Sequence, residues 1–394
     1  MRVLISAESF EPSINGVTNS VVRMVRHLRT RGHEVEVVAP APGPDRTVDD
    51  VPVTRVPGAT IPFYGSMTFG LASSRAVDEV IERFRPDAVH LAAPVVLGAR
   101  IGERAAARGV PTVAVFQTDI SGFVRQYGLS AMSGPVWTWL RRVHRNADLT
   151  LAPTETVADE LERRGFGEVA VWGRGVDQLQ FDRRRRIRRP GEDRVRVGYV
   201  GRLAREKQLD DLAPVLALPG VDLVIVGDGP ERDQLTERLP GATFTGFLRG
   251  DALGEAVASL DVFVHPGTHE TFCQAIQEAM AAGVPVVAPA AGGPLDLVVP
   301  EETGLLYPPG RPSELVAAVA RLAGDAALRA RFGEAGRAKV AGRTWGAIGD
   351  ELIAHYEAAI ASRSLSAMAS SSSAFGEVSA LRKSRLAIDA SGTT

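Results

Sequence analysis

Two glutamates, Glu270 and Glu278, lie eight residues apart in the stretch HPGTHETFCQAIQEAMAAGVPVVAP, which covers residues 265–289. Apolar residues at helical spacing predict a helix over Thr271–Ala282 that buries one face. The peptide N–H groups that open such a helix can bind phosphate, and here they belong to Thr271, Phe272 and Cys273. Carboxylates on either side of a bound diphosphate could accept hydrogen bonds from sugar and ribose hydroxyl groups. The spacing alone fits a surface helix with two solvated acids equally well.

A second set of charged residues lies in GRLAREK, residues 201–207, directly after the predicted strand Val195–Val200. Ligands of open α/β sheets bind at strand carboxyl ends, so Arg202 and Lys207 can both reach a ligand from a loop that Gly201 holds. Arginine makes a forked contact and lysine a point contact, and together they suit a diphosphate. Taken alone they also fit an ordinary basic helix start, so their meaning depends on the phosphate-binding helix end in the same half.

Weaker signals come from a few other positions. Gly16 lies in the first strand-to-helix loop, where Rossmann-like sheets bind anions. Gly227–Glu231 could approach a ligand or only connect a strand to a helix, and Phe247 could pack on a base or in the core. His265 and His269 lack metalloprotease spacing, which favours hydrogen-bonded histidines over a metal site. The dinucleotide, P-loop and hydrolase motifs are absent from the sequence.

The composition is that of an ordinary globular protein. The 394 residues allow two domains, and 45% hydrophobic and 23% charged residues with a net charge of −2 give no reason to expect nucleic acid. The single cysteine, Cys273, excludes an internal disulfide and fits a reducing compartment. With no signal-peptide pattern and no long uninterrupted apolar stretch, we expect a cytoplasmic protein.

Short β-rich runs alternate with amphipathic helical patterns, which predicts two α/β domains with parallel sheets that face each other across a cleft. The arginine run Arg183–Arg186 is too basic and unpatterned to form a helix or strand; it fits a solvated hinge better than an anionic-lipid contact. GRLAREKQ is expected to open a helix. The predicted organisation is an N-terminal Rossmann-like domain at 1–178, a linker at 179–193, a second Rossmann-like domain at 194–344, a helix at 345–362 that crosses back to the first domain, and a disordered tail at 363–394.

In this combination the motifs resemble the retaining family-4 glycosyltransferases of GT-B fold. Six segments match in order across both domains, namely PSINGV, WGRGVDQLQF, GRLAREK, VIVGDGPER, FTGFL and HETFCQAIQEAMAAGVPVVA. The last contains the family's E-x7-E element, here Glu270 and Glu278. The resemblance implies that a sugar is transferred from a nucleotide-sugar donor with retention. It also implies that no metal, other cofactor or protein nucleophile takes part.

The resemblance further implies a role for each matching position. Arg202 and Lys207 would hold the donor diphosphate and stabilise the leaving group, assisted by the backbone amides of residues 271–273. Glu270 would contact the transferred sugar, and Glu278 the ribose. The other matches are Gly16 and Gly201 at the diphosphate loops, Phe247 beside the base, and Asp177 and Phe181 in structural roles.

Two positions depart from the family's pattern. Many relatives carry a histidine at the end of the fourth N-terminal strand, where this chain reads Phe116-Gln117-Thr118-Asp119. Gln117 cannot donate a charged hydrogen bond to the sugar, whereas Asp119 could accept one and orient the acceptor hydroxyl. Both are candidate catalytic residues. Gln274 stands where relatives often carry glycine.

Within the family, FQTD and WGRGVD look most like actinobacterial α-mannosyltransferases that use GDP-mannose and glycolipid acceptors. A lipid acceptor implies peripheral contact with the inner membrane surface. The alternative is a helix core with a solvated face; the residues concerned are Phe63, Tyr64, Met67, Phe69, Trp137, Trp139, Arg141, Arg142 and Arg145. Other activities in this fold are a UDP-sugar-dependent glycosyltransferase, a sugar-nucleotide epimerase and a phosphorylase. A two-domain sugar-binding protein is the non-enzymatic alternative.

Overall fold

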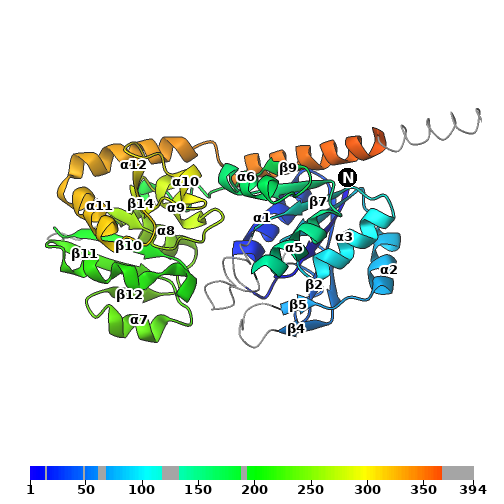
Figure 1. The fold of residues 1–394 in the computed structure, drawn as a ribbon, viewed down its shortest axis with the longest axis horizontal. Coiled ribbons are helices and arrows are strands. Elements are labelled where there is room, and N and C mark those ends of the chain that lie inside the picture. Colours follow the sequence, from blue (N-terminus) through cyan, green and yellow to red (C-terminus); the bar gives the residue numbers. More distant parts are fainter. Residues whose placement is uncertain (14–15, 48, 61–67, 118–132, 188–192, 366–394) are drawn as a thin grey trace, which may run out of the picture.

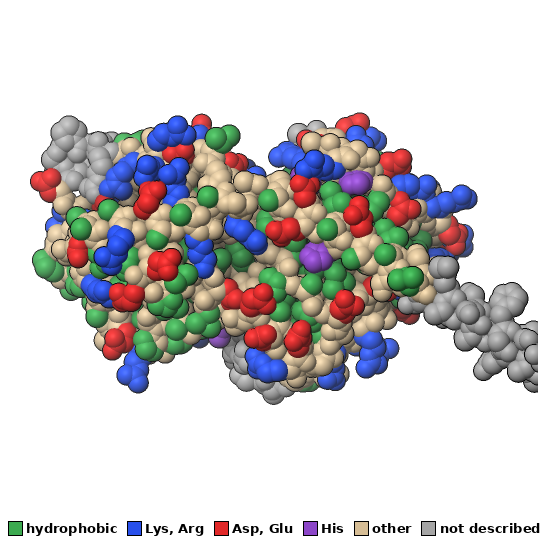
Figure 2. All heavy atoms as spheres, turned by 90° about the horizontal axis from the view of Figure 1, so that it is seen from above, with side chains coloured by type: hydrophobic (Ala, Val, Ile, Leu, Met, Phe, Trp, Pro, Cys, Tyr) green, Lys and Arg blue, Asp and Glu red, His purple; other side chains and the backbone are tan. Residues whose placement is uncertain are grey.

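The computed structural model describes residues 1–13, 16–47, 49–60, 68–117, 133–187 and 193–365. Two parallel sheets, each covered by helices, form two lobes (Figure 1). The outline of the molecule narrows between these lobes when it is seen from above (Figure 2). The predicted pair of Rossmann-like domains is therefore confirmed.

The N-terminal sheet has seven strands in the order β3-β2-β1-β6-β7-β8-β9. They are β1 (Arg2–Ala7), β2 (Glu34–Pro40), β3 (Val53–Val56), β6 (Ala88–Ala92), β7 (Thr112–Val115), β8 (Leu149–Ala152) and β9 (Val169–Val171). A small antiparallel pair adds β4 (Gly58–Thr60) and β5 (Thr68–Gly70), and the helices are α1 (Gly16–Thr30), α2 (Ser74–Phe84), α3 (Leu97–Ala107), α5 (Ser133–His144) and α6 (Glu155–Arg163). The strand order reverses between β1 and β6, and such a switch point opens a crevice at the strand carboxyl ends.

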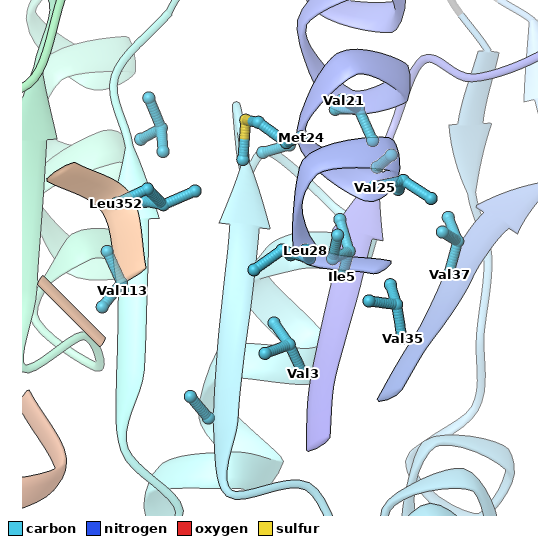
Figure 3. Packing of buried hydrophobic residues seen from close by; sticks show 14 of the residues in the cluster. Val3, Ile5, Val21, Met24, Val25, Leu28, Val35, Val37, Val113 and Leu352 are labelled. Atoms are coloured by element: carbon cyan, nitrogen blue, oxygen red, sulfur yellow. The ribbon is translucent and has the colours of Figure 1, made fainter. Parts of the chain in front are cut away.

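Helix α1 shows how the sequence pattern fixes one face of this sheet. Its apolar residues recur at helical spacing, and Val21, Met24, Val25 and Leu28 are all buried. They point toward the sheet, where they join residues of β1 and β2 such as Ile5 and Val37 in one buried cluster (Figure 3). This packing holds the start of α1, at Gly16, beside the carboxyl end of β1.

The C-terminal sheet has six strands in the order β12-β11-β10-β13-β14-β15, and its order reverses between β10 and β13. The strands are β10 (Val195–Val200), β11 (Val221–Val226), β12 (Thr243–Gly246), β13 (Val262–Val264), β14 (Val286–Pro289) and β15 (Gly304–Tyr307). The α-helices are α7 (Arg232–Arg238), α8 (Gly250–Ala258), α9 (Gln274–Ala281), α10 (Pro294–Leu297), α11 (Pro312–Gly324) and α12 (Ala326–Val340). The 3-10 segments are η2 (Arg183–Arg185), η3 (Arg205–Lys207) and η4 (Leu209–Ala217).

The last helix crosses back to the N-terminal lobe, as predicted (Figure 1). Residues 345–365 are helical, so the helix continues beyond residue 362, where we expected its end. Leu352 lies in the N-terminal core, and Tyr356 O–H lies 2.9 Å from His90 Nδ1 on β6. The indole N–H of Trp172 donates to the Ile348 carbonyl at 2.9 Å. The predicted tail from 366 onward lies outside the described residues.

The arginine run Arg183–Arg186 contains a regular element and pairs with acids, while Arg183, Arg184 and Arg186 remain exposed to solvent. Its first residues form the 3-10 turn η2, which the Asp182 carboxylate caps, so the expectation of no regular element is wrong here. Each arginine pairs with an acid, and most of these acids lie far along the chain. The pairs are Arg183–Glu334, Arg184–Asp182, Arg185–Asp251 and Arg186–Asp261. The run is therefore bound to the surface of the C-terminal domain.

Candidate active site

The candidate residues gather where strands end beside the two switch points. In the C-terminal domain, Gly201 follows β10 and His265 follows β13, and these two strands flank the switch point directly. In the N-terminal domain, Gly16 follows β1 and Gln117 follows β7. Because parallel strands end at the same edge of a sheet, each set of loops lies at a ligand-binding edge.

Lys207, Glu270 and His265 form the charged centre of the C-terminal edge. The Lys207 ammonium donates to Glu270 Oε1, and His265 Nε2 lies 3.1 Å from the same oxygen. The Lys207 side chain is 22% exposed and that of Glu270 is 16% exposed. Lysine has three donors and a carboxylate two oxygens, so, with regard to the described part of the chain, this pair keeps two N–H groups and Glu270 Oε2 for a ligand.

Burial opposes ionisation of Glu270, but Lys207 and His265 outweigh it and hold the pKa of the carboxyl group below its usual value. Burial likewise opposes the charge on Lys207, and Glu270 outweighs it, so the pKa of the ammonium rises. Both residues are therefore charged at neutral pH, and neither can lose its partner without leaving a largely buried charge.

Tight backbone packing shapes the loop after β10. Gly201 has a φ of +155°, and a side chain there would meet Tyr199 Oη at 2.6 Å. A side chain at Gly227 would come within 1.9 Å of the Gly201 carbonyl. The Tyr199 hydroxyl donates to the Arg202 carbonyl at 3.0 Å, and the side chain of Arg202 is exposed. The expected α-helix is absent here, because GRLAREKQ ends in the 3-10 turn η3.

The helix that carries Glu278 begins later than predicted, because α9 starts at Gln274. Cys273 takes a left-handed conformation with φ +71° and ends the preceding loop. Gly293 N donates to the Glu270 carbonyl at 2.7 Å, and a side chain at Gly292 would come within 2.3 Å of that carbonyl. Thr271, Phe272 and Cys273 therefore belong to a loop fixed by this glycine pair, and the prediction that they open the helix is wrong.

The other predicted donor-binding residues lie around this loop. Burial raises the pKa of Glu278 on α9 to about 7, although a hydrogen bond from Gln274 opposes the rise. Phe247 follows β12 and is 54% exposed, with the Arg249 guanidinium 4.8 Å from its ring centroid. Gly16 is exposed at the start of α1. An exposed aromatic ring at a strand end is available to a planar base.

Phe272 and Cys273, by contrast, are buried. Their side chains therefore belong to the core, and only their backbone amides can serve a ligand. Asp177 caps the turn after the domain exit, because its carboxylate accepts from Leu179 N and Gln180 N at 3.2 and 3.0 Å.

A polar network across the domain boundary includes Arg174, which the sequence analysis missed. Arg174 is 8% exposed; its guanidinium donates to Ser20 Oγ at 2.8 Å and to Gln117 Oε1 at 2.6 Å. Gln277 of α9 donates to the Arg174 carbonyl at 2.9 Å. The Thr271 hydroxyl donates to the Gln117 carbonyl at 2.9 Å, which places Gln117 beside the loop of residues 271–273. Asp119, the other candidate catalytic residue of the N-terminal domain, lies outside the described residues.

Three potential metal ligands meet in the cluster, namely His265, Glu270 and Cys273, whose ligand atoms lie within 4.8 Å of one another. The Lys207 ammonium already contacts the carboxylate of this group. Burial also raises the pKa of the Cys273 thiol, which disfavours the thiolate that a metal needs. The donor set fits a permanent lysine cation better than a divalent ion.

Comparisons with known proteins match both halves of the chain. Residues 14–178 match the family described as Glycosyltransferase Family 4, and residues 180–339 match that described as Glycosyl transferases group 1. A GDP-mannose-dependent alpha-mannosyltransferase of Mycolicibacterium smegmatis is 50% identical over 381 residues, which cover 93% of this chain and 100% of that protein. A protein of the same name from Mycobacterium tuberculosis is 47% identical, with 91% and 97% covered.

A solved structure supports the same architecture. Sucrose-phosphate synthase from Thermosynechococcus elongatus superposes with a TM-score of 0.75 at 20% identity, covering 92% of this chain and 99% of that one. This likeness confirms the GT-B fold. With both halves matched in order and with similarity to relatives along nearly its whole length, the chain belongs to the family-4 glycosyltransferases and is a hexosyltransferase.

Proposed function

We propose that the enzyme transfers mannose from GDP-mannose to a hydroxyl acceptor, with retention of configuration at the anomeric carbon. The observation that carries the donor is the 50% identity, over nearly the whole chain, to a relative named as GDP-mannose-dependent. The Lys207–Glu270 pair at the switch point supports this chemistry. It presents cationic donors for a diphosphate and, beside them, a carboxylate oxygen for a sugar hydroxyl.

The proposed step is a front-face substitution. The bond between the anomeric carbon and the diphosphate oxygen breaks, and a bond to the acceptor oxygen forms on the same face. The acceptor proton passes to the departing phosphate, so the products are GDP and an α-mannoside. Arg202 and Lys207 stabilise the negative charge that develops on the diphosphate. Glu270 holds the sugar, and Glu278 accepts from the ribose hydroxyls.

A donor screen tests this function. Purified enzyme would be incubated with GDP-mannose, GDP-glucose or UDP-glucose, with and without a lipid extract, and released nucleotide and glycolipid would be measured. We expect acceptor-dependent GDP release from GDP-mannose. Preference for UDP-glucose would make the protein a UDP-sugar-dependent transferase, and conversion of the donor alone would make it an epimerase. Binding without turnover of any donor would contradict the proposal.

We propose that no metal takes part, because Lys207 supplies positive charge beside the carboxylate that a metal would need. Activity measured after dialysis against EDTA should match activity in Mg²⁺ within about twofold. Loss of activity in EDTA, with recovery on adding Mg²⁺ or Mn²⁺, would contradict this arrangement of the leaving-group site.

Helix α5 supports a lipid acceptor and peripheral contact with an anionic membrane surface. Trp139 is 44% exposed, and Arg141 and Arg142 are exposed beside it on the same helix. Trp137 instead stacks on Phe116, with ring centroids 5.8 Å apart, and belongs to the core. Cationic side chains beside an exposed tryptophan suit an anionic lipid surface. Helices long and apolar enough to cross a membrane are absent from the described residues.

Vesicle sedimentation tests the membrane contact. Arg141→Glu with Arg142→Glu should reduce binding to phosphatidylglycerol vesicles at least fivefold, and a matched pair on the C-terminal domain, Arg311→Glu with Arg331→Glu, should not. Equal binding by both pairs would assign the contact to another surface. Of the remaining candidates, Phe69 is half-buried in β5, and Phe63, Tyr64 and Met67 lie outside the described residues.

A further inference from the structure

Arg174 is a buried cation without an acidic partner among the described residues. It is 8% exposed, and burial lowers its pKa to about 10, so it remains protonated at neutral pH. Its side chain contacts the Ser20 hydroxyl, the Gln117 amide oxygen and the Trp172 ring, whose centroid lies 5.5 Å from the guanidinium carbon. Burying an unpaired charge costs several kcal/mol, so the fold must gain something from this position.

The arginine determines how the Gln117 amide is oriented. A guanidinium group has five donors and no acceptor, so only the amide oxygen of Gln117 can face it. The 2.6 Å contact joins Arg174 Nη2 to Gln117 Oε1, which directs the amide nitrogen away from the arginine. A free glutamine amide could turn its oxygen either way, and this one cannot.

The amide nitrogen of Gln117 is therefore a hydrogen-bond donor that is available to a ligand. Gln117 is 8% exposed, and its buried Nε2 has no hydrogen-bond partner among the described residues. A buried donor without a partner is costly, and such groups are retained where a ligand completes the bond. The carbonyl of Gln117 accepts a hydrogen bond from Thr271. The Nε2 group therefore lies on the side of the N-terminal domain that faces the loop of residues 271–273.

We propose that Arg174 is a positioning residue: it fixes the Gln117 amide so that Nε2 donates to a hydroxyl group of the transferred sugar. This inference rests on the proposed glycosyl transfer and assigns the N-terminal half of its sugar site. The network reaches both domains, because Gln277 of α9 binds the Arg174 carbonyl and Ser20 of α1 binds its guanidinium. The main chains of Arg174 and Gln117 are thus both bonded to the C-terminal domain, through Gln277 and Thr271.

Two substitutions test separately the Nε2 group of Gln117 and the arginine that positions it. Gln117→Glu keeps an oxygen for Arg174 and replaces the Nε2 donor by a carboxylate oxygen, and Arg174 balances the added charge, so the fold should be retained. Arg174→Met removes the support and leaves Gln117 in place. Arg163, exposed at the end of α6, gives the matched control Arg163→Met. Turnover would be measured with the best of GDP-mannose, GDP-glucose and UDP-glucose, and affinity for the matching nucleoside diphosphate by calorimetry.

Gln117→Glu and Arg174→Met should each lose about 10- to 100-fold in kcat/KM, and the control Arg163→Met should not. This range runs from the loss of one hydrogen bond to the sugar to the loss of one to developing charge. The affinity for GDP or UDP should stay within about threefold, because the nucleotide lacks the sugar. Arg174→Met combined with Gln117→Ala should lose no more activity than the less active of Arg174→Met and Gln117→Ala alone, because both residues act through one donor.

Several outcomes would overturn the assignment. Full activity of Gln117→Glu would show that Nε2 has no role, even if Arg174→Met failed to fold. Losses that multiply in the double variant would make the two residues independent, and a parallel loss of diphosphate affinity would make Arg174 a purely structural residue. If the wild-type enzyme does not turn over GDP-mannose but does turn over another sugar nucleotide, only the proposed identity of the sugar donor would be wrong.

Discussion

Replacing Lys207 by methionine tests the charged centre of the site most directly. Two unit charges at a hydrogen-bonding separation of ~3 Å attract by about 5 kcal/mol at an effective dielectric constant of ~20. Part of this attraction offsets the cost of burying the ammonium and carboxylate groups, since the Lys207 and Glu270 side chains are only 22% and 16% exposed. Breaking a buried pair by removing one partner costs about 3–5 kcal/mol. Residual solvent contact places the expected loss in unfolding free energy near 3 kcal/mol.

The effect on catalysis should be larger than this loss of stability implies. Removing one preorganised group that stabilises developing charge costs about 10²- to 10³-fold in kcat. The assay is GDP release from GDP-mannose, with the unfolding free energy measured in urea on the same preparations. Arg205→Met is the matched control, because Arg205 is an exposed residue of the same turn, η3. It should change kcat by less than threefold.

The double variant Lys207→Met/Glu270→Gln separates the two effects. It removes both charges, so the unfolding free energy should recover most of the 3 kcal/mol lost by Lys207→Met, because no buried charge is left unpaired. Activity should not recover, because the cation for the diphosphate is still missing. The reasoning is refuted if Lys207→Met retains more than a third of the wild-type kcat, or if the double variant recovers activity together with stability.

Two pH effects follow from the buried titratable groups. Because Glu278 has a pKa of about 7, and its ionised form is proposed to bind the ribose, the KM for donor should rise about tenfold from pH 8 to pH 6, and Glu278→Gln should abolish this dependence. Burial lowers the pKa of His90 to about 3 and that of His144 to about 4. Below pH 6.5 only the unfolded chain gains these protons, so each histidine should cost about 2 kcal/mol of stability at pH 5. The raised pKa of Glu278 acts in the opposite sense and should offset about one histidine, which leaves a net loss. The midpoint urea concentration should decrease when the pH is lowered from 7 to 5. No decrease, or an equal decrease in the wild type and in His90→Gln, would contradict this.

The C-terminal half of the site could be predicted from sequence because its geometry is local. Gly201 directly follows a buried apolar strand, and Glu270 stands six residues after β13. Strand ends in a parallel sheet share an edge, so the spacing along the chain already brought Lys207 and Glu270 to one place. The ion pair between them joins residues 63 positions apart and is not part of that prediction, because strand spacing does not fix how the two side chains are oriented.

The helix start shows where this local logic fails. The apolar spacing extends back to Phe272, and on pattern alone the helix includes it. In the fold, Gly292 and Gly293 pack against the backbone of residues 270–272, and the left-handed Cys273 must turn the chain before α9 can begin. The glycine pair is remote in sequence, so the boundary is a tertiary effect that helical periodicity cannot report.

The N-terminal wall was the hardest part to predict, for the same physical reason. Arg174 lies in an irregular segment with no periodicity, and its two side-chain partners are 154 and 57 residues away in the chain. In sequence its neighbours identify it only as part of a domain exit, where an arginine is ordinarily solvated. Burial next to a glutamine changes its chemistry: the arginine now dictates which end of the Gln117 amide meets a ligand. If this is so, substitution of either residue removes the same hydrogen bond to the sugar, and substitution of both should add little further loss.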